Sequence, residues 1–97
     1  IDLDTVLSGR FDNVTASASS VVSSSINVGI RIDGASVPEM NYILAKASGG
    51  DKSTGLEIDL SSPRITKLTA SGAGAYSSNY GLYTGSGGNV TLHGSTL

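Results

Sequence analysis

GIRID at residues 29–33 returns as GLEID at residues 55–59 and as GLYTG at residues 81–85. The interval from Gly29 to Gly55 equals the interval from Gly55 to Gly81, and the apolar residue after each glycine keeps the same spacing. The opening IDLD of residues 1–4 joins the series at a slightly longer offset, which aligns Ile1 with Ile30. A period of this length indicates a repeat protein in which each repeat forms one unit that stacks on its neighbours.

A second apolar pattern has a similar period. Met40, Ile65 and Val90 are evenly spaced, and Phe11 precedes Met40 by the same longer offset that separates Ile1 from Ile30. In each copy the next inward residues follow at three and then five positions, and this uneven spacing predicts a corner followed by a strand. The predicted inward columns are Ile1 with Ile30, Leu56 and Leu82; Leu3 with Ile32, Ile58 and Thr84; Phe11 with Met40, Ile65 and Val90; Val14 with Ile43, Leu68 and His93; and Ala16 with Ala45, Ala70 and Ser95.

Two places depart from the regular period. The first interval is longer because SASSVVSSSIN (residues 17–27) is longer than KASGGDKST (residues 46–54). In the last repeat, the even spacing of Ile43 and Leu68 would place His93, a polar residue, at an inward position. We therefore expect the strand in NVTLHGSTL (residues 89–97) to slip by one residue, so that Leu92 and Leu97 face the core.

The short alternating segments, without a helical i, i+3, i+4 stripe, indicate strands. One coil alone cannot bury its apolar row, whereas coils stacked about 4.8 Å apart pair every strand with its equivalents above and below. We therefore predict an all-β fold, a parallel β-helix (β-solenoid) of about 3.5–4 coils of 25–29 residues, as a single module over residues 1–97.

The outward positions support the same register. One predicted column holds Arg10, Glu39, Arg64 and Asn89, and another holds Asp2, Arg31, Glu57 and Tyr83. At the spacing of stacked coils, like charges repel and opposite charges attract by about 1 kcal/mol before screening by salt. The signs alternate in both columns, as this register requires.

Composition argues against several classes of function. The net charge is −2 and only 14% of residues are charged, so there is no basic patch for a phosphate backbone. No apolar run approaches the roughly 20 residues that span a bilayer, and there is no cysteine for a disulfide or a thiolate metal site. We expect neither nucleic-acid binding nor a membrane span.

Two phrases carry a resemblance. FDNVTASAS (residues 11–19) and SPRITKLTASGAGAYSSNYGLYTGSGGNVTLHGSTL (residues 62–97) are similar to degenerate repeats of bacterial secreted and surface proteins and of some phage tail-fibre-like proteins. The resemblance covers nearly the whole chain, although MNYILAKAS (residues 40–48) departs from the usual Asn-Val-Thr-Ala. It implies a right-handed parallel β-helix of the pectin-lyase-like kind and an extracellular or cell-surface location. Such β-helices serve as enzymes, adhesins and inert shafts, so the resemblance implies no single activity.

One column suggests a metal site. Asp4, Asp33 and Asp59 stack, with Gly85 at the end, and calcium would neutralise three carboxylates at coil spacing. However, the Gly-Gly-x-Gly-x-Asp repeat of calcium-binding β-rolls is missing, and no second carboxylate column is expected nearby. Aspartate at a strand end typically accepts backbone N–H bonds in the following turn. We favour this structural role and expect no cofactor, with calcium as the alternative.

The residues that enzymes need are dispersed. The eight acidic residues form no evident carboxylate pair of the kind that hydrolyses glycosides. His93 is the only histidine, and the serines have no partner base in a recognisable pattern. We therefore expect no catalytic residue and no enzymatic activity, and a structural role for His93 at a strand end.

A cluster of tyrosines is the best candidate for ligand binding. Tyr76, Tyr80 and Tyr83 are close in sequence, and aromatic planes of this kind can cover the apolar face of a sugar ring. The alternative, which we favour at this stage, is that the tyrosines pack on one another as part of the β-structure.

The coil edges are the remaining candidate surface. The chain begins and ends in or near strands, and an uncapped coil invites another strand. We expect either a fragment of a longer β-helix or a subunit that assembles end to end. The predicted contact residues are Ile1, Leu3, Phe11, Leu82, Val90, Leu92 and Leu97. The leading hypothesis is a structural or adhesive extracellular module of a filament, stalk or fibre; the alternative is a carbohydrate-binding or polysaccharide-processing domain.

Overall fold

The computed structural model describes residues 1–5, 9–34, 36–85 and 87–96, and these residues form strands and turns without a helix. The strands are β1 (Asp2–Asp4), β2 (Arg10–Ser20), β3 (Ile26–Asp33), β4 (Glu39–Gly49), β5 (Lys52–Ile58), β6 (Arg64–Ala73), β7 (Ser78–Thr84) and β8 (Thr91–His93). Since the described part of the chain has no helix, it also has none that is long and apolar enough to cross a membrane. The predicted all-β class is confirmed.

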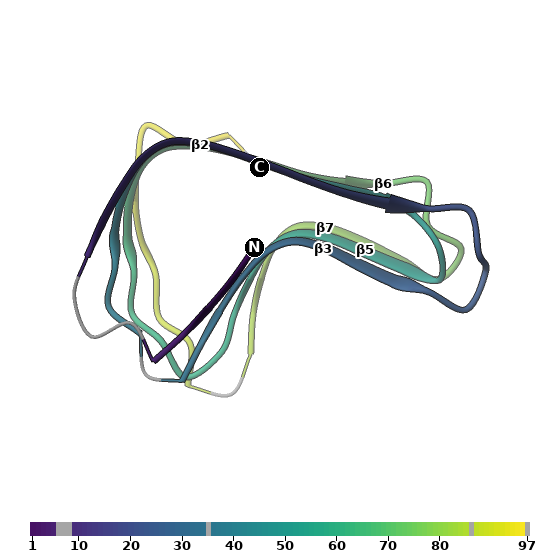
Figure 1. Ribbon diagram of the computed structural model, residues 1–97, viewed down its shortest axis with the longest axis horizontal. Coiled ribbons are helices and arrows are strands. Elements are labelled where there is room, and N and C mark those ends of the chain that lie inside the picture. The colour runs from purple at the N-terminus through teal and green to yellow at the C-terminus, as the bar shows by residue number, and fades with distance from the viewer. Residues whose placement is uncertain (6–8, 35, 86, 97) are drawn as a thin grey trace.

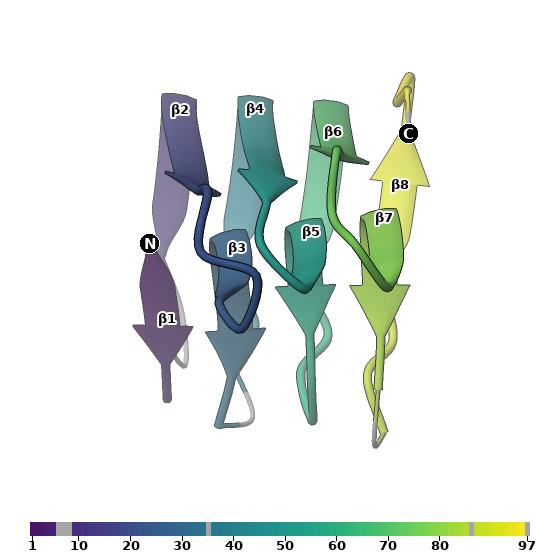
Figure 2. The same ribbon diagram turned by 90° about the vertical axis from the view of Figure 1, so that its right-hand side faces the viewer.

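Consecutive strands alternate between two sheets, and every pairing is parallel. The first sheet has the order β1-β3-β5-β7 and the second has the order β2-β4-β6-β8, as Figure 2 shows. In Figure 1 the chain runs clockwise from β1 to β2 and back to β3, and Figure 2 shows that it recedes from that viewpoint as it does so. The fold is therefore a right-handed β-solenoid. Three complete turns lead from Asp2 to Tyr83, and the chain up to Thr96 adds part of another.

The register agrees with the sequence columns in the first three coils. Ile30 pairs with Leu56 and Leu56 with Leu82 in the first sheet, while Phe11 pairs with Met40 and Met40 with Ile65 in the second. Both alternating charge columns are also confirmed over these coils. The extra length of the first turn lies between β2 and β3, where residues 21–25 take the place of residues 50 and 51.

The last coil corrects the prediction. Leu92, not Val90, pairs with Ile65, so the strand is shifted by two residues and not by one. A shift of two preserves the alternation of side chains between the faces of the sheet, whereas a shift of one would reverse it. One additional residue lies in the connection between β6 and β7, and the other lies in the glycine-rich turn between β7 and β8, where the Gly88 N–H donates to the Gly85 carbonyl at 2.6 Å. Leu92 therefore packs against the core as expected, His93 ends β8 on the exposed side, and Leu97 lies outside the described residues.

The predicted corner is a bend within β2, β4 and β6, and in the last coil it follows β8 directly. Asn13 (φ 54°), Tyr42 (φ 56°) and Lys67 (φ 60°) adopt left-handed backbone conformations at equivalent positions, and Gly94 (φ 63°) continues the column in the last coil. A left-handed residue interrupts the alternation of the strand, which explains why inward residues are three apart across the bend and two apart after it. Only the asparagine and glycine are residues that favour this conformation.

A column of glycines produces the opposite bend in the first sheet. A Cβ atom on Gly55 would lie 2.7 Å from the backbone nitrogen of Ser71 and 2.9 Å from the backbone oxygen of Ala45, both in the second sheet. Gly29 is equally close to the backbone of Lys46, at 2.8 Å. The two sheets therefore approach each other until only glycine fits between them, and Figure 1 shows the cross-section narrowing where β3, β5 and β7 curve inward.

The core follows from this shape. On the wide side, large apolar side chains with at most 2% exposure fill the interior: Ile30, Ile32, Met40, Ile43, Leu56, Ile58, Ile65 and Leu68. On the narrow side the strands of the second sheet contribute alanines such as Ala45 and Ala47. There Asn27 is also buried, and its side-chain amide donates to the carbonyls of Ser48 and Gly49 at 3.0 and 3.1 Å.

Candidate functional site

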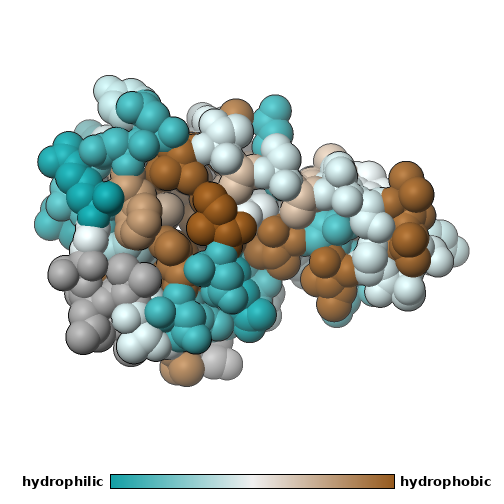
Figure 3. All heavy atoms as spheres, viewed as in Figure 1, coloured by the Kyte–Doolittle hydropathy of each residue, from teal (hydrophilic) through white to brown (hydrophobic). Residues whose placement is uncertain are grey.

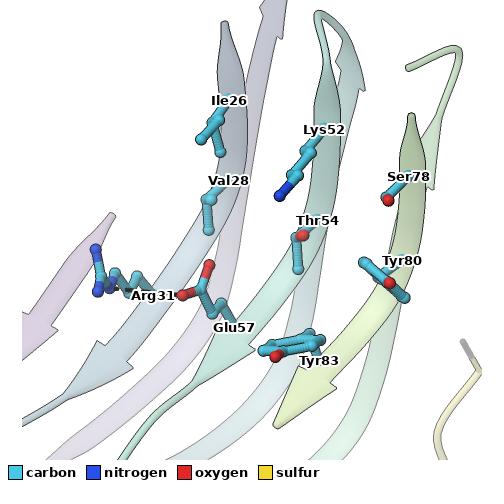
Figure 4. A pocket seen from close by; sticks show the side chains of 9 residues that line it. All are labelled: Ile26, Val28, Arg31, Lys52, Thr54, Glu57, Ser78, Tyr80 and Tyr83. Atoms are coloured by element: carbon cyan, nitrogen blue, oxygen red, sulfur yellow. Dashed lines mark ion pairs between the residues drawn. The ribbon is translucent and has the colours of Figure 1, made fainter. Parts of the chain in front are cut away.

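The glycine bend leaves a hollow on the outer face of the first sheet. This groove has a volume of about 390 Å³ and crosses β3, β5 and β7. Its lining residues are Ile26, Val28, Arg31, Lys52, Thr54, Glu57, Ser78, Tyr80 and Tyr83, and Figure 4 shows their side chains. We refer to it below as the outer groove.

The parallel register arranges the lining in rows that run along the stacking direction. Three rows result: Ile26 with Lys52 and Ser78; Val28 with Thr54 and Tyr80; and Arg31 with Glu57 and Tyr83. The second row lies one residue before the glycine column and the third row two residues after it, because the residue that follows each glycine, such as Ile30 or Leu56, packs in the core. The outer groove therefore exists because each coil repeats the same short phrase.

Two tyrosines form the aromatic end of the outer groove. The ring centroids of Tyr80 and Tyr83 lie 5.4 Å apart with their planes inclined by 51°, a tilted geometry in which aromatic rings attract each other. Both residues nonetheless keep much of their surface accessible, 43% for Tyr80 and 44% for Tyr83. The expectation that tyrosines pack on one another thus holds for this pair, and the pair still presents free ring surface to the outer groove.

The other two tyrosines lie elsewhere. Tyr76 is 89% exposed in the turn between β6 and β7, where it lines a separate shallow hollow with Val21. Tyr42 is 63% exposed on the second sheet. Of the three tyrosines that the sequence suggests for sugar binding, the structure brings together Tyr80 and Tyr83.

Charged side chains form the opposite end. Arg31 Nε lies 3.3 Å from Asp33 Oδ2 and 3.9 Å from Glu57 Oε1. Burial raises the pKa of the Glu57 carboxyl, and its hydrogen bond with Asp59 raises that pKa further, against the opposing effect of Arg31. The guanidinium thus holds two carboxylates in place at the edge of the outer groove.

A further carboxylate lies near the aspartate column. Glu57 and Asp59 are two residues apart and interact through a side-chain hydrogen bond, although the column of Glu57 also holds Arg31 and Tyr83 and is not a second carboxylate column. Asp4 pairs with Asp33 as predicted, and the Asp59 N–H donates to the Ile32 carbonyl, which places Asp59 in the next coil. The three stacked aspartates are therefore part of a wider acidic surface around Arg31.

The structure gives no support to a calcium ladder. Among the described residues, no three His, Cys, Asp or Glu side chains are grouped so that they could hold a metal ion. Asp33 Oδ1 is buried and accepts no hydrogen bond there, so this oxygen does not cap the following turn as expected. Burial raises the pKa of the Asp33 carboxyl, and the negative charges of Asp4 and Asp2 raise it further. The positive charge of Arg31 lowers the pKa of Asp33 and so offsets part of this rise.

Comparison with protein-family models, with curated proteins and with solved structures finds no match to this chain. The solenoid is thus established by its geometry, and the function has to be argued from its surfaces.

The tyrosines stand out in the sequence, whereas most of their neighbours in the outer groove were not predicted. Thr54 and Glu57 precede Tyr80 and Tyr83 by one period each, so the period itself contained the signal. The sequence offered no reason to place Ile26 and Lys52 in a site. They lie before the phrases that recur at Gly29 and Gly55, and their row combines an apolar, a cationic and a hydroxyl side chain.

The coil edges are the other candidate surface. Leu3, Phe11 and Val14 in the first coil and Leu82, Val90 and Leu92 in the last are partly buried and pack against the core. Ile1 is 55% exposed on the first-coil side, and Figure 3 shows hydrophobic residues on this face behind a partly polar rim. Apart from Val14, which the sequence placed in an inward column, these are residues that the sequence predicted for assembly. The remaining one, Leu97, is not described.

Proposed function

We propose that this chain is a structural and adhesive β-helix module that extends by stacking further coils on its open edges. The observation that carries the proposal is that β1 and β7 are the outermost strands of one sheet, and β2 and β8 those of the other. In the described chain each of them pairs on one side only, and an unpaired strand edge is a template for another strand. When another coil pairs with these edges, it would also cover the partly exposed apolar residues beside them.

The existing register specifies how a second copy would dock. Two neighbouring columns of the second sheet show the step from coil to coil. One column consists of Phe11, Met40, Ile65 and Leu92, and the other consists of Asp12, Asn41, Thr66 and His93. Repeating the step once more places Phe11 of the next copy on Leu92 and its Asp12 beside His93. The apolar pair continues the core, and a histidine beside a carboxylate is electrostatically complementary when the histidine is protonated.

We also propose membership of the right-handed β-helix repeats of bacterial secreted and surface proteins or phage tail-fibre-like proteins, and therefore an extracellular or cell-surface location. The support is the coincidence of the resembling phrases with the coil corners and strands. In such a setting the next coil belongs either to the same polypeptide or to another copy, and the contacts are the same in both cases. A structural role needs no catalytic residue.

Self-association is the measurable consequence. We expect the purified chain to form oligomers or fibres whose size grows with concentration, measured by light scattering after size exclusion and by electron microscopy. Leu82→Lys places a charge on the last-coil edge and should reduce this association. Leu60→Lys is the matched control, because Leu60 is an exposed leucine, 60% accessible, outside the strands. A chain that stays monomeric at high concentration, or two variants that behave alike, would contradict end-to-end assembly of copies.

A further inference from the structure

We propose that the outer groove binds a short, uncharged oligosaccharide of about two hexose rings. This site is distinct from the coil edges, because its lining side chains point away from the core on the face of the first sheet. Sugar binding in the outer groove can therefore be tested independently of coil stacking.

The aromatic end provides the first argument. Hexoses have an apolar ring face made of C–H groups, and tyrosine covers such a face with its ring while its hydroxyl remains available for hydrogen bonds. Tyr80 and Tyr83 are both well exposed, and Figure 4 shows their rings beside Thr54 and Glu57. The pair thus offers a preformed aromatic surface next to polar groups.

The polar groups provide the second argument. A carboxylate accepts two hydrogen bonds and a guanidinium donates several in a fixed plane, so Glu57 and Arg31 suit the paired hydroxyls of a sugar ring. The contact between Arg31 and Glu57 at 3.9 Å keeps both groups side by side in the outer groove. Thr54 adds a hydroxyl between them and Tyr80.

The charges around the outer groove argue against an anionic ligand. Two cationic side chains line the outer groove, Arg31 and Lys52, and one carboxylate, Glu57, lines it with them. Asp33 pairs with Arg31 at 3.3 Å and cancels the remaining charge. Asp2, Asp4 and Asp59 are near enough to act on Asp33 electrostatically, so the surroundings of the outer groove add negative charge and disfavour an anionic sugar.

The dimensions agree with this ligand. Neighbouring coils are about 4.8 Å apart, which is close to the length of one hexose ring, so three strands present about two rings' length along a row. A volume of about 390 Å³ lies within the range of small-molecule sites. A linear sugar lying along the rows would contact Tyr80 and Tyr83 with one ring and the Arg31–Glu57 pair with the next.

The test is a titration of the isotope-labelled chain with cellotriose and with maltotriose, the β- and α-linked glucose trimers, followed by amide chemical shifts. We expect saturable shifts in β5 and β7 with at least one trimer at millimolar concentration. Tyr80→Ala/Tyr83→Ala should weaken binding about tenfold or more, and Glu57→Gln should weaken it while leaving the stack intact. Tyr76→Ala, which removes the same ring from outside the outer groove, should leave binding unchanged.

Several results would overturn the proposal. These are the absence of saturable shifts with both neutral trimers, shifts that map outside β5 and β7, or an equal loss of binding in Tyr76→Ala. Tighter binding of an anionic trimer, a triuronic acid, would refute the neutral ligand. Thermal melting accompanies each titration, and if Tyr80→Ala/Tyr83→Ala proves unfolded, Glu57→Gln carries the test alone.

Discussion

Replacing Gly55 by alanine tests the central packing claim of this fold. The added Cβ would meet three backbone atoms at 2.7–2.9 Å, belonging to Ser71, Gly81 and Ala45. Backbone atoms cannot rotate away, so the two sheets would have to separate. Overpacking of this kind costs about 1–3 kcal/mol, whereas the lower entropy of the unfolded chain returns about 0.4–1 kcal/mol. We expect a net loss of about 2 kcal/mol.

For a domain of this size that loss lowers the melting temperature by about 8–16 °C, which far-UV circular dichroism measures directly. Gly74→Ala is the matched control. Its Cβ would have 3.7 Å to the nearest atom, the Gly49 nitrogen, but Gly74 has φ 67°, so the change costs only left-handed strain of about 1 kcal/mol. If Gly55→Ala melts within a degree or two of the parent chain, or no lower than Gly74→Ala, the sheets do not touch at the glycine column and the reasoning is wrong.

Three further changes test the core, a buried hydrogen bond and the acidic surface. Leu56→Ala, at a fully buried position, should cost about 2–5 kcal/mol in denaturant unfolding, and Leu60→Ala, at an exposed one, less than about 0.5 kcal/mol; similar values would contradict the assigned core. Asn27→Ala should cost about 1–3 kcal/mol, because two carbonyls of β4 lose their donor; an unchanged unfolding midpoint would show that these bonds do not contribute. Asp33→Asn should raise the melting temperature at neutral pH and lose this advantage below about pH 3.5. Because the pKa of Asp33 is raised above its ordinary value of 3.8, the folded state binds more protons than the unfolded state, and the parent chain loses stability as pH rises from that ordinary value through the raised pKa. An advantage of Asp33→Asn that is constant with pH would refute this sign.

The sequence predicted those parts of the fold that depend on repetition. The constant interval that separates Gly29, Gly55 and Gly81 correctly aligned Ile30 with Leu56, because a parallel stack requires equivalent residues to superpose. The corner was also predictable, since the inward spacing of three residues across Tyr42 cannot occur in an uninterrupted strand.

Other features could not be predicted for physical reasons. Tyr42 and Lys67 give no local sign of a left-handed backbone, because their neighbours in the stack impose it against their own preference. The shift of two residues at Leu92 is the sum of one extra residue between β6 and β7 and one in the glycine-rich turn between β7 and β8, and neither connection has a side-chain pattern to fix its length. The acidic surface was missed because aligned columns do not reveal contacts between columns, and Glu57 and Asp59 interact across neighbouring ones.

The glycine column links the fold to the outer groove. Where the sheets touch at Gly55, the first sheet bends inward. Thr54 before the glycine and Glu57 two residues after it line the outer groove, while Leu56 between them packs in the core. If a second copy stacks in the same register, its Asp2 follows Tyr83 in the row of Arg31 and Glu57, so an acidic group adjoins the aromatic end. Both tyrosines and the Arg31–Glu57 pair belong to one copy, so the isolated chain should already bind with its full set of contacts. Sugar affinity should therefore stay the same across the range of protein concentration in which stacking increases, and an affinity that rises with association would contradict this.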